Sequence, residues 1–194
     1  MVIMSAHSMA HEHEHNHGTC CKSVSRTCSQ NFDEMDFARG VWYAAMNGDE
    51  ARVQKHLEKN SCPDIVDSAG YTALHYAARN GHIDVCRLLL RHGANPNCET
   101  RAGRATPLHR AAYGGHLEIV KLLVQYQAKL DLADIDGQTA LHKAAQKAHE
   151  DVVKILVDAF VLLTSVRDKW HKRPIDYVPE VNKKLRSLLE PINV

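Results

Sequence analysis

Apolar residues recur at helical spacing in three runs of the chain, at positions 85–90, 119–124 and 152–157. Residues on one helix face recur every three or four positions, so each run predicts a helix with one buried face. Upstream of each run lies a shorter segment that opens with Thr72, Thr106 or Thr139. Threonine is a good helix N-cap, so each threonine predicts the start of another helix. The pattern therefore predicts helix–turn–helix units joined by polar loops.

These units repeat at a nearly fixed period. The tetrapeptides TALH, TPLH and TALH begin 34 and 33 residues apart and end in His75, His109 and His142. An alanine pair follows each tetrapeptide at the same distance, and a second histidine follows each pair. A motif that recurs at one period together with its neighbours is the signature of a repeat protein.

The repeated pattern resembles the ankyrin repeat, D-x-x-G-x-T-P-L-H-x-A-A-x-x-G-H followed by an apolar helix, over residues 37–177. The resemblance implies an all-α fold, an ankyrin-repeat solenoid of stacked helix-turn-helix units with short β-hairpin tips. The chain would then consist of a disordered His/Cys/Ser-rich tail (1–31), a divergent N-terminal capping repeat (32–66), three ankyrin repeats (67–99, 100–133 and 134–166), and a degenerate repeat with a C-terminal capping helix (167–194).

Three departures from the repeat predict local irregularities. One extra residue within positions 101–105 predicts a bulged tip in the third unit. Ala148 stands where the other units have glycine, and Phe160 stands where the second helix normally ends in glycine. An alanine at positive φ costs about 1 kcal/mol. We therefore expect a remodelled turn or a less stable fourth unit.

The composition narrows the function only slightly. The chain has 24 basic and 23 acidic residues, so its overall field does not favour nucleic acid or an anionic membrane as a partner. No stretch approaches the roughly 18 consecutive apolar residues of a membrane span, and the first residues do not resemble a secretion signal. We therefore expect a cytoplasmic or nuclear protein whose cysteines are reduced.

The repeated histidines invite a metal or catalytic interpretation, but their spacing opposes it. Stacked repeats would hold His75, His109 and His142 roughly 10 Å apart, whereas ligands bind zinc at about 2 Å. The family resemblance implies instead that each one bonds the backbone of the adjoining hairpin. We expect an equally structural role for the histidines that open the second helices, namely His82, His116 and His149.

Two common catalytic motifs are absent from the sequence. Neither the nucleophile elbow G-x-S-x-G nor the phosphate-binding Walker loop occurs in it. We therefore expect no enzymatic activity and no cofactor. The tail leaves one alternative to a solvated segment, because it contains residue types that bind zinc or copper, although their spacing is not that of a zinc finger. These candidate ligands are His11, His13, His15, His17, Cys20 and Cys21.

Variable positions beside the motif histidines are the candidates for partner binding. In each first helix, two positions three residues apart share one side of the helix. Tyrosine, arginine, tryptophan and methionine, the types enriched in protein interfaces, recur there and at the tips. The two helix columns are Tyr43, Tyr76, Arg110 and Lys143, and Met46, Arg79, Tyr113 and Gln146, and the tip residues are Tyr71, Arg101, Arg104, Gln138 and Trp170.

These observations predict a monomeric, non-enzymatic scaffold or adaptor that binds an acidic, partly apolar protein segment on its concave, basic and aromatic face. Metal binding by the tail is one alternative. A nucleic-acid-associated adaptor is a second, because Arg101, Arg104, Arg110 and Lys143 are interleaved with tyrosines. An idle, solvated surface is a third. Asn97 also loosely resembles the hairpin asparagines that are hydroxylated in some ankyrin proteins.

Overall fold

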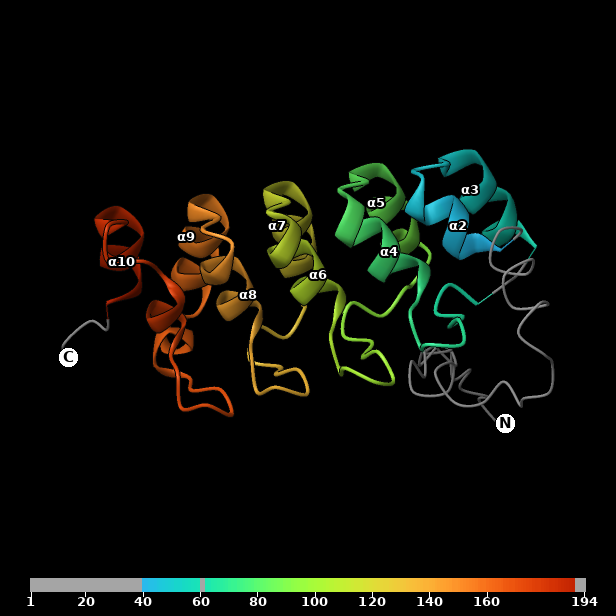
Figure 1. Cartoon of the computed structure of the whole chain (residues 1–194). Coiled ribbons are helices and arrows are strands. Elements are labelled where there is room, and N and C mark those ends of the chain that lie inside the picture. The colour runs from blue at the N-terminus through green and yellow to red at the C-terminus, as the bar shows by residue number, and fades with distance from the viewer. Residues whose placement is uncertain (1–39, 60–61, 191–194) are drawn as a thin grey trace, which may run out of the picture.

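The computed structural model describes residues 40–59 and 62–190, which form a row of helix pairs (Figure 1). The inner helices pack side by side, and they are α2 (Val41–Met46), α4 (Ala73–Asn80), α6 (Pro107–Gly114) and α8 (Ala140–Gln146). Each is followed by an outer helix, in order α3 (Glu50–Glu58), α5 (Ile83–Arg91), α7 (Leu117–Gln125) and α9 (Glu150–Ala159). The loops between pairs all project on the same side (Figure 1). The predicted all-α repeat solenoid is confirmed.

Alanine pairs explain the close packing of the inner helices. Ala77 and Ala78 on α4 and Ala111 and Ala112 on α6 are each 0% exposed, and the two helices are in direct contact. A side chain that ends at Cβ lets the neighbouring backbone approach, and the leucine of each tetrapeptide fills the remaining space. The small residues of the motif therefore set the repeat spacing, and the apolar runs bury the outer helices.

Each inner helix begins with the same capping arrangement, for which α6 serves as the example. The Nδ1 atom of His109 accepts a hydrogen bond from the backbone N–H of Thr106 at 3.1 Å. The threonine side chain faces the backbone N–H of the same histidine, which completes a capping box. Pro107 occupies the first turn, where its missing N–H costs nothing. Gly115 ends the helix at φ 73°, so local sequence fixes both ends.

The three expected irregularities resolve differently. Ala148 keeps the left-handed turn at φ 57°, so this turn is strained rather than remodelled. The backbone at Phe160 is extended, at φ −157°, and leads into the 3₁₀ helix η1 (Val161–Ser165), so this turn is remodelled. In the third unit Arg104 adopts φ 50° within a loop closed by a hydrogen bond from the N–H of Thr100 to the carbonyl of Ala105. The predicted bulge is present.

The tips are turns rather than two-stranded hairpins. Within residues 40–59 and 62–190 the only β feature is one isolated antiparallel bridge, between Val66 and Thr72. In the second unit Oδ1 of Asp67 accepts hydrogen bonds from the backbone N–H groups of Ala69 and Tyr71, at 3.0 and 2.8 Å. Equivalent bonds recur two units and three units further on. Because side chains close these short loops, few backbone groups remain to pair as strands.

The C-terminal end is covered by a modified unit. The 3₁₀ helix η2 (Pro174–Tyr177) packs against α8 in the place of an inner helix, and α10 (Lys183–Leu189) packs against α9. Leu185 and Leu189 of α10 are both 0% exposed. Terminal repeats must shield the last apolar face of a solenoid, and α10 performs this role here. In the described part of the chain no helix is long and apolar enough to cross a membrane.

The cysteines of the described residues behave in two ways. Cys86 and Cys98 are buried, and burial raises the pKa of the Cys86 thiol to about 12, which makes it unreactive near neutral pH. Cys62 is disulfide-bonded. The expectation of uniformly reduced cysteines is therefore corrected at this position, because it rested only on the lack of a secretion signal.

Candidate functional site

The motif histidines connect neighbouring repeats. Nε2 lies 3.0 Å from the Ala105 carbonyl in His75 and 2.9 Å from the Gln138 carbonyl in His109. His142 forms the same contact one repeat further on. Burial lowers the pKa of His75 to about 4, so its ring is neutral, with Nδ1 accepting and Nε2–H donating. These rings are therefore fully engaged with backbone and have no role as nucleophiles or metal ligands.

The second row of histidines faces the opposite direction along the stack. Nε2 of His82 lies 2.9 Å from the Met46 carbonyl, and Nε2 of His116 lies 2.9 Å from the Arg79 carbonyl. His149 repeats the contact in the next unit. Both rows thus hold the scaffold together, and the candidate site must be sought among the variable positions.

The eight predicted positions on the inner helices form one surface, here called the inner-helix surface. None of them is buried, and Tyr43 and Tyr113 are 38% and 43% exposed. The tip that carries Tyr71 adjoins this surface, because Arg110 on α6 donates a hydrogen bond to the Tyr71 hydroxyl. The members on the helices are Tyr43, Met46, Tyr76, Arg79, Arg110, Tyr113, Lys143 and Gln146.

An ordered aromatic cluster occupies the middle of this surface. The Nη2 group of Arg110 donates to the hydroxyl of Tyr71 at 2.6 Å, and the rings of Tyr71 and Tyr76 lie 5.5 Å apart. Tyr76 in turn donates to Oδ2 of Asp67 at 2.6 Å. Burial, followed by this hydrogen bond, raises the pKa of Tyr76. The Nε atom of Arg110 is buried without a partner. The cluster therefore holds a cation in a fixed position.

Two exposed cations lie near Tyr113. The Nζ atom of Lys147 lies 4.6 Å from the centre of the Tyr113 ring, and its hydrogen bond and charge lower the pKa of that tyrosine. Arg79 adds further positive charge near the same ring. Within the described residues neither cation pairs with a carboxylate. Lys147 was missed in the sequence, although it directly follows the column residue Gln146.

Lys143 differs from these cations because its charge is compensated. Its Nζ atom lies 2.7 Å from Oδ2 of Asp134, and it donates to Oε1 of Gln138 at 2.7 Å. Burial by itself would raise the pKa of Asp134, but the hydrogen bonds from Lys143 and from the Gln138 backbone outweigh it and lower that pKa. Lys143 therefore contributes little net positive charge to the surface.

Gln138 is buried, whereas the sequence predicts an exposed tip residue that contacts a partner. Its side chain is only 4% exposed. Its amide nitrogen donates to the hydroxyl of Tyr177 at 2.9 Å and to Asp168 at 3.2 Å, and its oxygen also accepts from Gln146 at 3.0 Å. Tyr177 and the other bonds hold the pKa of Asp168 at about 2 against the opposing effect of burial. Gln138 is thus the centre of a buried polar network and is excluded from the contact surface.

The remaining tip residues differ in how freely they present their side chains. Trp170 is 57% exposed. Arg104 forms an ion pair with Glu99 at 3.0 Å, and Arg101 donates to the Ser68 carbonyl at 3.2 Å. Among the tips, the exposed indole of Trp170 is therefore the strongest candidate for an apolar contact, whereas the charge of Arg104 is compensated.

Two further sequence candidates fall outside this surface. Oδ1 of Asn97 accepts a hydrogen bond from the Lys129 backbone at 2.7 Å, so this half-buried side chain links two loops. The six tail residues proposed as metal ligands lie outside the described residues. Over residues 40–59 and 62–190, no group of three or more histidine, cysteine, aspartate or glutamate side chains is arranged to hold a metal ion. Metal binding by the tail stays a prediction.

Comparison with known proteins agrees with the fold. A family model described as "Ankyrin repeats (3 copies)" matches residues 9–100, 41–134 and 96–165. The chain is 51% identical over 85 residues to human ankyrin repeat domain-containing protein 39. This alignment covers 43% of this chain and 46% of that protein. The chain is 55% identical over 67 residues to the Bos taurus protein of the same name, and this alignment covers 34% of this chain and 37% of that protein. Mouse BCL-6 corepressor-like protein 1 is 46% identical over 88 residues, 45% of this chain and 5% of that protein. The alignments thus span less than half of each relative.

Proposed function

Because this chain belongs to the ankyrin-repeat family, whose members generally act by protein–protein interaction without catalysis, we propose that it is a non-enzymatic scaffold that binds a partner protein. The contact region is the inner-helix surface together with Trp170 at the last tip. The observation that carries this proposal is the exposed ring of Tyr113 with two cations near it, Arg79 and Lys147, which make no ion pair within the described residues.

The chemistry of this surface favours an acidic segment with apolar side chains as the partner. Arg79, Lys147 and Arg110 attract carboxylates, and Tyr113 and Trp170 offer apolar area with polar edges. Arginine and aromatic residues dominate the binding energy of most protein interfaces. The hydrogen bonds within the aromatic cluster fix side chains before binding, so little further ordering entropy is lost when a partner docks.

The nucleic-acid alternative draws less support from the geometry. It rested on four basic residues, of which Arg104 is paired with Glu99 and Lys143 is paired with Asp134. Non-specific binding to nucleic acid depends on the number of phosphates that free cations can neutralise. We therefore retain the protein scaffold as the proposal, acting as a monomer in the cytoplasm or the nucleus. Light scattering on the purified chain measures the oligomeric state.

Substitution of both cations tests the proposed surface. The full chain is used to select peptides from a random display library, and the selected peptides are measured against the variant Arg79→Glu with Lys147→Glu. We expect acidic peptides with apolar residues, which lose at least about tenfold in affinity for the variant because two attractive contacts become repulsive. Both side chains are exposed, so the melting temperature should change little.

A charge-matched control separates a local effect from a global one. The variant Arg91→Glu with Lys154→Glu makes the same change of charge on the exposed faces of the outer helices α5 and α9. It should bind the peptides as the unchanged protein does. If selection yields basic or neutral peptides, or if both variants bind equally well, the inner-helix surface is not the binding site.

A further inference from the structure

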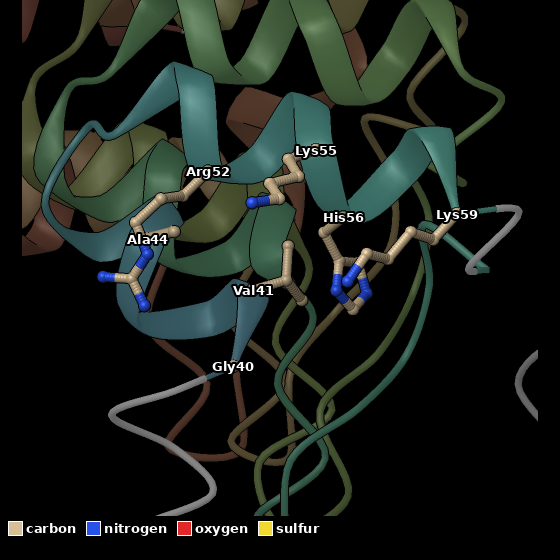
Figure 2. Close-up of a pocket in the computed structure, with 7 residues that line it drawn as sticks. All are labelled: Gly40, Val41, Ala44, Arg52, Lys55, His56 and Lys59. Carbon is tan, nitrogen blue, oxygen red and sulfur yellow. The ribbon is translucent and has the colours of Figure 1, made fainter.

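A pocket of about 230 Å³ lies between α2 and α3, at the N-terminal end of the stack (Figure 2). Val41 and Ala44 of α2 form its apolar wall, and side chains from α3 form the opposite wall (Figure 2). Pockets that hold drug-sized molecules measure roughly 300–1,000 Å³. This one is smaller, so it suits a few amino-acid side chains better than an organic ligand.

Among the described residues that line the pocket, every ionisable side chain is basic, namely Arg52, Lys55, His56 and Lys59. Lys55 and Lys59 make no ion pair within the described part of the chain. The Nε2 atom of His56 is buried without a hydrogen-bond partner. Burial, and then the charge of Lys59, lowers the pKa of His56 and keeps its ring neutral. Buried polar atoms nearly always find a partner, so the pocket favours an occupant that carries carboxylates.

The sequence just before the pocket has the complementary composition. Residues 32–37 read FDEMDF, so three carboxylates alternate with apolar side chains. Gly40 lines the pocket itself, only a few residues further along the chain. An extended chain spans at most about 3.6 Å per residue, which keeps Asp36 within about 14 Å of Gly40. The acidic segment is therefore tethered within reach of the pocket.

We propose that the acidic segment at residues 33–37 occupies the basic pocket, with its carboxylates at Lys55 and Lys59 and its apolar side chains toward Val41. A short tether raises the effective concentration of the segment to the millimolar range, so individually weak ion pairs suffice to hold it. The chain's own acidic segment then covers the N-terminal end of the stack, as a terminal repeat must. This inference does not depend on the proposed partner surface.

Limited digestion of the full chain with trypsin tests the proposal. Cleavage after Arg39 requires residues 33–37 to leave the pocket, so its rate follows the undocked fraction. The variant Lys55→Glu with Lys59→Glu should be cut after Arg39 about tenfold faster, because it removes the charges that hold the segment. Cleavage after Arg26, far from the pocket in sequence, is the internal control and should keep its rate. Intact-mass measurement follows both products.

A second set of variants separates docking from the sequence preference of the protease. Neutralising the segment, with Asp33→Asn, Glu34→Gln and Asp36→Asn, should accelerate cleavage after Arg39 in the unchanged chain. It should have no further effect in the pocket variant, because both sets remove the same contact. Equal acceleration in both backgrounds would overturn the proposal. So would an unchanged rate after Arg39 in the pocket variant, or a matching acceleration after Arg26.

Discussion

Acid should destabilise this fold through the motif histidines, and His75 allows the effect to be calculated. The side chain is 0% exposed, and burial lowers its pKa from 6.5 to about 4. The unfolded chain therefore takes up a proton near the ordinary histidine pKa, while the folded site resists protonation. Stability is complete above about pH 6.5 and falls as the pH decreases toward 4. Between about pH 7.5 and pH 5, His75 alone accounts for a loss of about 2 kcal/mol.

The measurement compares urea unfolding at the two pH values in matched variants. In His75→Gln the titrating group is gone, so the loss of unfolding free energy on acidification should be about 2 kcal/mol smaller than in the unchanged chain. His92 is exposed on the outer side of the second unit, and His92→Gln should leave the loss unaltered. Comparing two pH values for each variant removes the stability that the substitution itself costs. An equal loss in all three proteins would refute the assignment of acid sensitivity to the buried histidine.

Two further predictions concern the scaffold. Ala148 and Gly115 occupy equivalent left-handed turns, so Ala148→Gly should raise the free energy of unfolding by about 1 kcal/mol. Gly115→Ala should lower the free energy of unfolding by more than that, because the added Cβ atom would lie 2.6 Å from the His149 ring. Urea unfolding of both variants measures the two changes, and equal changes would contradict the prediction. Gln138→Ala should lower the free energy of unfolding by about 1–3 kcal/mol, because it leaves the buried polar groups that bond to Gln138 without a partner. Thermal unfolding compares this variant with the exposed control Gln125→Ala. A decrease in melting temperature no larger than that of the control would contradict the role of Gln138 in the buried network.

The sequence was sufficient for the parts of the fold that depend on neighbours a few residues apart. Thr106 and His109 form their capping box within one helical turn, so their spacing alone predicted the helix start. The alignment of Ala148 with Gly115 likewise indicated the position of a left-handed turn. For the turn at Phe160 the sequence predicted where the repeat pattern breaks but not the conformation that results. That conformation includes a 3₁₀ helix, which depends on packing against later elements.

The candidate surface was less predictable because it depends on residues from several repeats. The burial of Gln138 results from Asp168 and Tyr177, which lie 30 and 39 residues further along the chain. The basic pocket likewise combines two helices of a divergent unit, where no repeat pattern marks the positions. The i, i+3 rule found which residues face outward. It could not find which of their charges are cancelled by carboxylates on the neighbouring tip.

The two opposed rows of histidines have a consequence for how the array can change in length. At the junction between the second and third units, His75 bonds forward to the Ala105 carbonyl and His116 bonds backward to the Arg79 carbonyl. Each internal unit thus brings one donor and one acceptor for each of its neighbours. A duplicated 33-residue unit inserted between two others would complete the same bonds on both sides. Gene duplication can therefore lengthen such a protein without any new contact having to evolve.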